Sequence, residues 1–426
     1  MTLDRRTFMQ FAAASGLLAL APSTLRAAEQ LAKRHKMPRV AIVGGGFGGA
    51  TAAKYLRMWS DNHIEVLLVE RQKNFISCPM SNTVLGGSRS MADITHSYDD
   101  LTKKHGVLRV EAEVTAIDPE KRTLRTARGE LPYDRLILAP GIDFMFEQIE
   151  GLDAKLADTQ IPHAWKAGPQ TALLRKQLEA MPDGGVYLLS IPKAPYRCPP
   201  GPYERACQVA FYLKNNKPKS KIIVLDANPD ITSKKGLFLQ AWNNLYPGMI
   251  DYRPNATVNR VDAKNRAVHT EFDEVKADVL NVVPPMRAGK ASDLAGVVTA
   301  DNRWCGVDFL SYESTARPNV HVIGDAVSSG LPKSGHMATS QAKVTAAAII
   351  ELLAGNQPDP DPVVANTCYS MVSDKEAMHV ANVFRYNQEK KQMAAAEGGG
   401  VSDRYSDTEG SYAKYWAQNI WADALK

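Results

Sequence analysis

The chain has 426 residues, of which 44% are hydrophobic and 23% are charged. This composition is that of a globular protein with several hydrophobic cores, and it excludes wholesale disorder, a collagen-like fibre and a multi-span membrane protein. The 51 basic and 46 acidic residues leave a formal net charge of +5, which is too small and too scattered to indicate a nucleic-acid-binding protein.

The first 28 residues have the pattern of an export leader. Arg5 and Arg6 precede an apolar run from Phe11 to Ala21, and small residues close the segment. The run is shorter than the roughly 20 residues that cross a bilayer, and the paired arginines are typical of a twin-arginine signal. We therefore expect residues 1–28 to be an export signal and the mature protein to lie in the periplasm. The alternative is an ordinary N-terminal helix, but the run has no amphipathic period. No later stretch reaches spanning length, so no transmembrane segment is expected.

A dinucleotide-binding fingerprint follows the leader. Arg39 to Val43 is predicted to be a buried strand, and it runs directly into the spacing G-x-G-x-x-G at Gly44, Gly46 and Gly49. These glycines permit a tight turn and a close approach of a pyrophosphate to the N-terminus of the next helix. A second strand then ends at Glu70, about 20 residues further on, where an acid binds ribose hydroxyls.

Two later strands identify the dinucleotide. One runs from Leu136 to Gly141, and the other, from Val320 to Ala326, brings Gly324 and Asp325 to its carboxyl end. This pair resembles the flavoproteins with two dinucleotide-binding domains, which implies FAD with Asp325 at its ribityl and phosphate groups. Lys333, just before an Ala-rich helix, is expected to stabilise negative charge on a reduced flavin. The alternative for Lys333 is a surface lysine beside a packing helix.

The segment between these strands repeats the α/β pattern. A strand at Val186 to Ile191 precedes a helix at Tyr203 to Leu213 and a second strand that ends at Asp226. The turn from Pro192 to Pro202 is rich in proline, which lacks the amide donors of a phosphate-binding loop. We infer that this unit has no nicotinamide site and that electrons come from another donor.

Five cysteines occur, at positions 78, 198, 207, 305 and 368. They are too few and too far apart for a disulfide framework, and they lack zinc-ligand spacing, so no metal site is expected. Cys207 and Cys305 are expected to be buried and unreactive.

Five longer motifs resemble one family. They are His163 to Gly168, Arg197 to Arg205, Ile323 to Ala326, Pro332 to Gly335 and Asn366 to Ser370. From about residue 38 to the C-terminus, the chain resembles the flavoprotein subunit of flavocytochrome c sulfide dehydrogenase, whose relatives include sulfide:quinone oxidoreductases.

The resemblance implies roles for three cysteines. Cys78 matches the cysteine that is joined through sulfur to the flavin 8α-methyl group, which implies covalent FAD; without the resemblance it is a small buried apolar residue. Cys198 and Cys368 match a redox-active pair. Hydrosulfide attacks disulfide sulfur and leaves a persulfide on one cysteine and a thiolate on the other. On composition alone, a structural bridge or two free thiols are the alternatives.

Two further residues match family positions. Glu204 matches an acid that handles protons at the site, although it could also cap the helix that it starts. Trp416 matches a tryptophan beside the flavin on the cytochrome side, although an aromatic stripe at helical spacing is more often core.

The expected fold class is α/β, with two Rossmann-like dinucleotide-binding-type domains and a C-terminal interface domain. Residues 38–151 and 286–355 are expected to form the FAD-binding domain, which is interrupted by the second, degenerate NADH-type domain at 152–285. Residues 356–426 are expected to form the interface domain.

The resemblance implies a sulfide dehydrogenase that passes electrons through FAD to a c-type cytochrome. The haem is expected on a cytochrome subunit or a soluble cytochrome c, because no Cys-x-x-Cys-His attachment motif occurs in this chain. One alternative is a sulfide:quinone oxidoreductase. The other is a non-enzymatic exported flavoprotein partner of a sulfur-oxidising complex.

Overall fold

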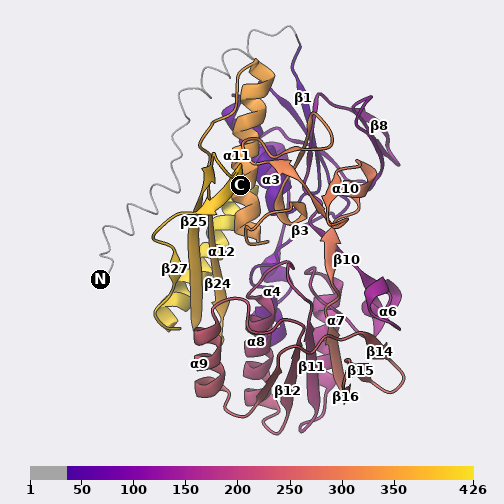
Figure 1. The fold of residues 1–426 in the computed structure, drawn as a ribbon, viewed down its shortest axis with the longest axis vertical. Helices are drawn as coiled ribbons and strands as arrows, with labels where there is room; N and C mark the ends of the chain where they lie inside the picture. The colour runs from indigo at the N-terminus through magenta and orange to yellow at the C-terminus, as the bar shows by residue number, and fades with distance from the viewer. Residues whose placement is uncertain (1–35) are drawn as a thin grey trace.

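Two α/β units lie one above the other, and a C-terminal sheet runs along the side of both (Figure 1). This computed structural model describes residues 36–426, so the expected export signal at 1–28 lies outside the described residues. Between residues 36 and 426, no helix combines the length and the apolar character that a membrane span requires.

The upper unit is built on a seven-stranded sheet with the order β21-β22-β23-β9-β1-β2-β5. Strands β23, β9, β1, β2 and β5 are parallel to one another, and β21 and β22 add an antiparallel edge. The bounds are β1 (Arg39–Val43), β2 (Glu65–Val69), β5 (Leu108–Val110), β9 (Arg135–Leu138), β21 (Val307–Asp308), β22 (Glu313–Ser314) and β23 (Val320–Val322). The central strands are buried and rich in Val, Ile and Leu, as strands covered on both faces must be.

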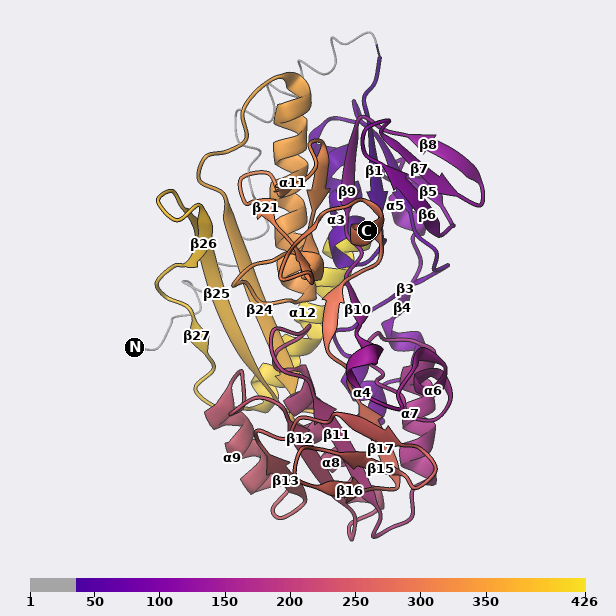
Figure 2. The same ribbon diagram turned by 45° about the vertical axis from the view of Figure 1, so that its right-hand side comes forward.

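Helices and a small sheet cover this unit. Helix α3 (Phe47–Trp59) packs against α11 (Gly335–Ala354), and α5 (Asp99–Lys103) packs against α3. A three-stranded antiparallel sheet stands beside them (Figure 2). Its strands are β6 (Val114–Asp118), β7 (Thr123–Thr126) and β8 (Gly129–Pro132).

The lower unit has a four-stranded parallel sheet with the order β13-β12-β11-β17. Its strands are β11 (Val186–Ile191), β12 (Lys221–Asp226), β13 (Ile250–Arg253) and β17 (Val279–Val282), and its helices are α6 (Ala154–Thr159), α7 (Pro169–Ala180), α8 (Gly201–Asn216) and α9 (Lys235–Leu245). A meander completes it with β14 (Arg260–Asp262), β15 (Ala267–His269) and β16 (Glu274–Lys276).

The chain crosses between the two units on a pair of antiparallel strands, β10 (Ile142–Phe144) and β18 (Met286–Ala288). These crossings lie close to the expected limits of the inserted domain, 152–285. Helix α4 (Ser81–Gly86), from the first part of the chain, packs against α7 and α8 of the lower unit. The upper unit therefore contributes directly to the junction where the two units meet.

The C-terminal unit is a four-stranded antiparallel sheet and one long helix, α12 (Asp407–Leu425). Its strands are β24 (Val363–Met371), β25 (Ala377–Asn387), β26 (Gln392–Ala395) and β27 (Gly400–Val401). Strand β24 contacts α11 of the upper unit and α8 of the lower unit, while α12 crosses to α3 (Figure 2). This arrangement fixes β24 beside the junction.

Short elements fill the connections. They are β3 (Phe75–Ile76), β4 (Thr95–His96), β19 (Val298–Ala300), β20 (Trp304–Cys305), α10 (Ala291–Leu294) and the 3-10 turns η1 (Ala92–Ile94), η2 (Phe146–Gln148) and η3 (Gly324–Ala326).

The predicted fold class is confirmed, since both parallel sheets are present. Two predicted strands are shorter than expected. The strand predicted for Val320 to Ala326 ends at Val322, because Gly324 has a φ of +77° and turns the chain into η3. The strand predicted for Leu136 to Gly141 ends at Leu138.

Candidate functional site

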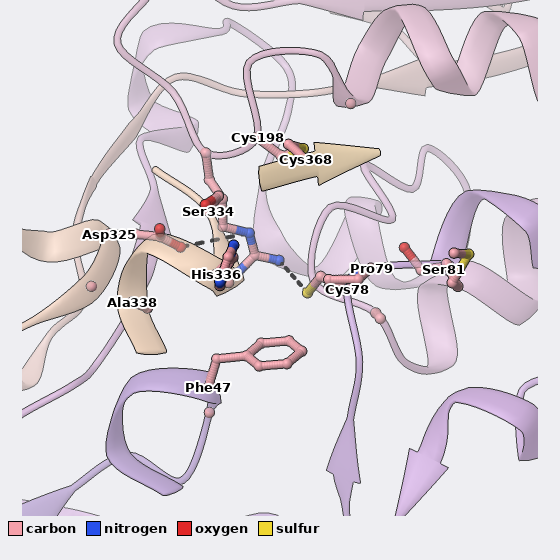
Figure 3. Close-up of a pocket in the computed structure, with 18 of the residues that line it drawn as sticks. Phe47, Cys78, Pro79, Ser81, Cys198, Asp325, Ser334, His336, Ala338 and Cys368 are labelled. Atoms are coloured by element: carbon pink, nitrogen blue, oxygen red, sulfur yellow. Dashed lines mark hydrogen bonds and ion pairs between the residues drawn. The ribbon is translucent and has the colours of Figure 1, made fainter. Parts of the chain in front are cut away.

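A cavity of about 280 Å³ lies where the three units meet. Its walls come from the glycine turn before α3, the turn before α4, the turn before α8, η3, the start of α11, β24 and α12. Figure 3 shows Cys198 and Cys368 side by side at one end of this cavity, with Cys78, Asp325 and Phe47 around it.

The glycine turn has the form that a dinucleotide requires. Gly44 has a φ of +100°, and a Cβ on Gly49 would lie 1.8 Å from the Gly44 carbonyl oxygen, so neither position accepts a side chain. Gly46, by contrast, has no atom within 4 Å of its would-be Cβ and lines the cavity at the N-terminus of α3. Glu70 follows β2 beside this turn, where its Oε2 accepts a hydrogen bond from the amide of Gly45 at 2.6 Å.

Asp325 stands on the opposite wall, in η3. Its Oδ2 lies 3.9 Å from Nε of Arg197, and its Oδ1 is buried with no hydrogen-bond partner among the described residues. Burial raises the pKa of Asp325, and Arg197 and Lys333 oppose that rise. A glycine turn at a helix N-terminus and a buried carboxylate oxygen that still needs a donor together fit FAD.

Lys333 lies against η3 and Trp304. Its ammonium donates to the carbonyl oxygens of Asp325 and Val327, both at 2.8 Å, and lies 3.7 Å from the centre of the Trp304 ring. It does not line the cavity at the glycine turn. Burial lowers the pKa of Lys333 to about 8. Lys333 therefore holds η3 in place, and its expected role in stabilising negative charge on a reduced flavin stays a prediction.

Cys78 lies in the turn before α4, on the cavity wall. Arg197 donates from Nη2 to the sulfur of Cys78 at 2.8 Å, while Nε of the same guanidinium faces Asp325 (Figure 3). Burial alone would lower the pKa of Arg197, but Cys78, Asp325 and Cys198 raise it. Arg197 is thus a fixed cation that connects the candidate tether with the candidate ribityl-binding acid.

Cys198 and Cys368 are brought together from distant parts of the chain. Cys198, with a φ of +56°, lies in the proline-rich turn, and its amide donates to the carbonyl oxygen of Lys333 at 2.9 Å. Cys368 lies in β24, and its side chain is hydrogen-bonded to that of Cys198. Both are free thiols in this structure, and both line the cavity.

The two thiols differ in acidity. The hydrogen bond from Cys198 lowers the pKa of Cys368, and Lys234 lowers it further against the effect of burial. The same hydrogen bond and burial raise the pKa of Cys198. The surroundings therefore favour a negative charge on Cys368 over one on Cys198.

Glu204, near the start of α8, is directed toward this pair rather than capping its own helix. Its Oε1 accepts from the amide of Met371 at 2.9 Å, and its Oε2 accepts from Nδ2 of Asn82 at 2.8 Å. Burial raises the pKa of Glu204, against these two hydrogen bonds. A buried carboxyl group with a raised pKa beside two thiols is suited to proton transfer.

Trp416 reaches the cavity from α12. Its ring centre lies 5.6 Å from that of Tyr369 and 6.3 Å from that of His336. His336 accepts a hydrogen bond from the amide of Thr367 at 2.8 Å, and burial lowers its pKa to about 4, so it is neutral and positions β24. Trp416 thus lines the cavity, and its place beside the flavin stays a prediction.

The acid at the end of the second strand of the lower unit is hydrogen-bonded within that unit. In a nucleotide-binding unit the acid at the end of the second strand, here Asp226, binds ribose. Asp226 is fully buried and accepts hydrogen bonds from Tyr203, Tyr252 and Asn228 at 2.7–2.9 Å. These bonds agree with the inference, from the proline-rich turn, that a nicotinamide site is absent.

The sequence prediction missed three residues of this site: Arg197, Asn82 and Lys234. Arg197 stands next to Cys198 in the motif from Arg197 to Arg205, so this motif did indicate that it could belong to the site. Asn82 and Lys234 carried none, because only folding brings them to the cysteines. Cys207 and Cys305 are buried and do not line this cavity, and residues 36–426 contain no cluster of side chains that could hold a metal ion.

Three family models match successive parts of the chain. The pyridine nucleotide-disulphide oxidoreductase model matches residues 38–171. The model for the central part of the sulfide dehydrogenase [flavocytochrome c] flavoprotein chain matches residues 171–284, and the flavocytochrome c sulphide dehydrogenase flavin-binding model matches residues 360–425.

Known relatives agree with these matches. The sulfide dehydrogenase [flavocytochrome c] flavoprotein chain of Chlorobaculum thiosulfatiphilum is 59% identical over 46 residues, which is 11% of this chain and 94% of that sequence. The mitochondrial sulfide:quinone oxidoreductase of Dictyostelium discoideum is 25% identical over 76% of this chain and 72% of its own length. The solved structure of the sulfide:quinone oxidoreductase from Aquifex aeolicus has a TM-score of 0.72 at 20% identity and covers 91% of both chains.

The fold and the cavity define a flavin-dependent oxidoreductase of the pyridine nucleotide-disulphide oxidoreductase class. Within that class, the chain belongs to the family of flavocytochrome c sulfide dehydrogenase flavoprotein chains, which is related to the sulfide:quinone oxidoreductases. The resemblance drawn from the sequence motifs is thereby confirmed.

Proposed function

We propose that this protein oxidises sulfide at Cys198 and Cys368 and passes the electrons through FAD to a c-type cytochrome in the periplasm. The observation that carries the proposal is the contact between these two cysteines, one from the turn before α8 and one from β24, in the cavity that fits FAD. The family to which the chain belongs supports sulfide as the donor.

The chemistry starts from the oxidised pair. Hydrosulfide attacks Sγ of Cys198, the new S–S bond forms a persulfide there, and the electron pair of the broken bridge leaves on Cys368 as a thiolate. No electrons are gained or lost overall in this exchange, because sulfide is oxidised as the bridge is reduced. The outer sulfur then leaves Cys198 by attack of a second hydrosulfide, which carries it away as a disulfide-level sulfur product and leaves Cys198 as a thiolate. A bound FAD would accept the two electrons that the two thiolates give up as the bridge re-forms, and it could release them singly.

Glu204 is proposed to take the proton that hydrosulfide or its persulfide loses. Its carboxylate lies in the wall of the cavity, held by Asn82 and by the amide of Met371. A carboxyl group with a raised pKa accepts a proton near neutral pH better than an exposed one does.

The flavin is proposed to be covalently attached to Cys78. Its sulfur lies on the cavity wall and is oriented by Arg197 at 2.8 Å. A tether would retain FAD after export, where no cytoplasmic pool can replace it. Acid precipitation tests it: yellow colour in the pellet is expected, and flavin in the supernatant would exclude the bond.

A c-type cytochrome is favoured as the acceptor because two family models carry the name flavocytochrome c. The second candidate acceptor is a quinone, and it is favoured by the relatives and the solved structure named as sulfide:quinone oxidoreductases. Anaerobic turnover with sulfide distinguishes the two, with cytochrome c in one cuvette and a quinone in liposomes in the other.

The test of the cysteine chemistry is anaerobic bleaching of the flavin by sulfide. Cys198→Ser should abolish bleaching while FAD stays bound. Cys207→Ser, at a buried cysteine that does not line the cavity, is the control and should bleach like the wild type. Bleaching that persists in Cys198→Ser would remove the disulfide mechanism, and a wild-type flavin that sulfide leaves unchanged would favour a non-enzymatic partner protein.

A further inference from the structure

Lys234 is a buried cation beside the cysteine pair. It begins α9 in a left-handed conformation with a φ of +54°, and only 7% of its surface is exposed. Its ammonium donates to the carbonyl oxygen of Cys368 at 3.1 Å and to Oγ of Ser370 at 2.8 Å. Lys234 therefore combines a strained backbone conformation with a buried charge, and its ammonium is hydrogen-bonded to β24, the strand that carries Cys368.

No carboxylate forms an ion pair with Lys234 among the ion pairs of residues 36–426. A buried ammonium is costly unless an anion compensates it. Two acids act on it without forming an ion pair: Glu204, which accepts hydrogen bonds from Asn82 and the amide of Met371, and Glu409, which pairs with His379 at 2.6 Å. The thiols of Cys368 and Cys198 also act on Lys234, and Cys368, which lies on the strand that the ammonium is hydrogen-bonded to, has the largest effect of these groups.

We propose that Lys234 is the counter-ion of Cys368, holding its sulfur as a thiolate in the reduced pair and stabilising it as the leaving group when the bridge opens. The role of Lys234 when the bridge opens rests on the proposed function, whereas its role as counter-ion in the reduced pair does not. In the opening step, the bond between the two sulfurs breaks, the persulfide forms on Cys198, and the electron pair stays on Cys368 beside the ammonium.

The charged groups around the two cysteines favour a negative charge on Cys368 over one on Cys198. Lys234 approaches Cys368 from α9, and Arg197 acts on Cys198 from the proline-rich turn. Glu204 acts on both sulfurs from α8 and raises the pKa of each, so it does not favour one over the other. Cys78 and Asp325 engage Arg197, and Glu409 acts on Lys234 from α12. Lys234 acts more strongly on Cys368 than on Cys198, whereas Arg197 acts on Cys198.

The test is the pH dependence of alkylation in the reduced holoprotein, with iodoacetamide as the probe and peptide mapping to separate the cysteines. Lys234→Gln keeps a hydrogen-bond donor but loses the charge, and Lys234→Arg keeps the charge. We expect Lys234→Gln to slow alkylation of Cys368 at pH 7 by about tenfold, which corresponds to a rise of about one pKa unit, and Lys234→Arg to restore most of the rate.

Lys235→Gln is the matched control, because Lys235 is the next residue, is exposed and pairs with Asp230. It should alkylate like the wild type. Equal rates for Lys234→Gln and the wild type would overturn the proposal, since a purely structural lysine is replaced by a neutral donor without effect on the thiol.

The wild type provides a measurement that does not depend on variant folding. Cys368 should be alkylated faster than Cys198 at pH 7, and the reverse order would overturn the proposal. Sulfide bleaching is recorded on the same samples. If sulfide leaves the wild-type flavin unchanged while the alkylation order holds, the proposed function fails and the counter-ion role of Lys234 stands.

Discussion

The three glycines in the turn before α3 differ in what prevents a side chain at each position. Gly44 needs its left-handed backbone, and Gly49 needs its missing side chain because the carbonyl oxygen of Gly44 occupies that space. Gly46 is open toward the cavity, so nothing in the protein itself forbids a side chain there. The fold therefore requires Gly44 and Gly49, whereas Gly46 matters only for a ligand that approaches the backbone.

This difference predicts opposite outcomes for two alanine variants. Gly46→Ala should fold with the thermal stability of the wild-type apoprotein but bind FAD at least about tenfold more weakly, because the methyl group meets the pyrophosphate. Gly49→Ala should lose stability by roughly 3 kcal/mol or more, since backbone atoms must move. Thermal melts of the apoproteins and flavin titrations measure both. A Gly46→Ala protein that binds FAD normally would contradict this reading of the turn.

Strand β23 shows how an element can carry a titrating group in its interior. His321 is fully buried in β23, where Nδ1 lies 2.9 Å from the carbonyl oxygen of Ser311 and Nε2 lies 3.1 Å from Nη1 of Arg135. A neutral ring fits these partners, donating from Nδ1 and accepting at Nε2. Burial and then Arg135 lower the pKa of His321 to about 3.

A fall in pH should therefore lower the free energy of unfolding of the protein. The folded pKa of about 3 lies below the ordinary value of 6.5, so the unfolded chain binds the proton first. The stabilisation is complete above pH 6.5 and is lost progressively as the pH falls toward 3. Between pH 7.5 and pH 5, the loss from this residue is about 2 kcal/mol, at about 1.4 kcal/mol for each pH unit below 6.5.

Denaturant unfolding at the two pH values measures this loss. His321→Gln should be less stable than the wild type at pH 7.5 but should lose about 2 kcal/mol less on acidification. His63→Gln, in the turn after α3, is the control and should keep the wild-type pH dependence. An unchanged pH dependence in His321→Gln would show that the ring is protonated in the folded protein.

At the scale of the whole molecule, the site exists only where three units meet. The upper unit supplies the glycine turn and Asp325, the lower unit supplies Cys198 and Glu204, and the C-terminal unit supplies Cys368. The C-terminal unit also has a large share of the exposed apolar surface. Of the nine large hydrophobic side chains exposed among residues 36–426, five belong to it: Val363, Val383, Val401, Tyr412 and Tyr415. Val363 and Val383 lie diagonally opposite each other on neighbouring strands with their side chains on the same face of the sheet, so they form an exposed apolar pair that a partner could cover.

The surface of the C-terminal unit is predicted to receive the electron acceptor. The double variant Val363→Asp and Val383→Asp, which changes two exposed side chains on one face of the sheet, should reduce electron delivery to cytochrome c by about tenfold, the effect of about 1.4 kcal/mol of lost contact. Bleaching of the flavin by sulfide should stay unchanged. Phe272→Asp is the control, because Phe272 is 82% exposed on a hairpin of the lower unit. Equal cytochrome reduction by the double variant and the control would place the acceptor elsewhere.

Local sequence patterns determined the elements of this protein. Strands β1 and β2, the glycine turn and Glu70 follow from short-range rules, because apolar runs and glycine spacing act within one βαβ unit. The quoted motifs indicated the family and gave Cys78, Cys198 and Trp416 as candidates. No local pattern indicated that the ammonium of Lys333 is held by carbonyl groups, because only the folded η3 presents them.

The tertiary structure alone decided which distant groups meet. Cys198 and Cys368 are 170 residues apart in the numbering, and their contact depends on β24 packing between α8 and α11. The effects of Lys234, Arg197 and Glu204 on the pKa values of those two thiols depend on burial at the same junction. Burial and long-range packing are properties of the whole fold, so no local pattern carries them, and the polarity of the cysteine pair could be read only from the structure.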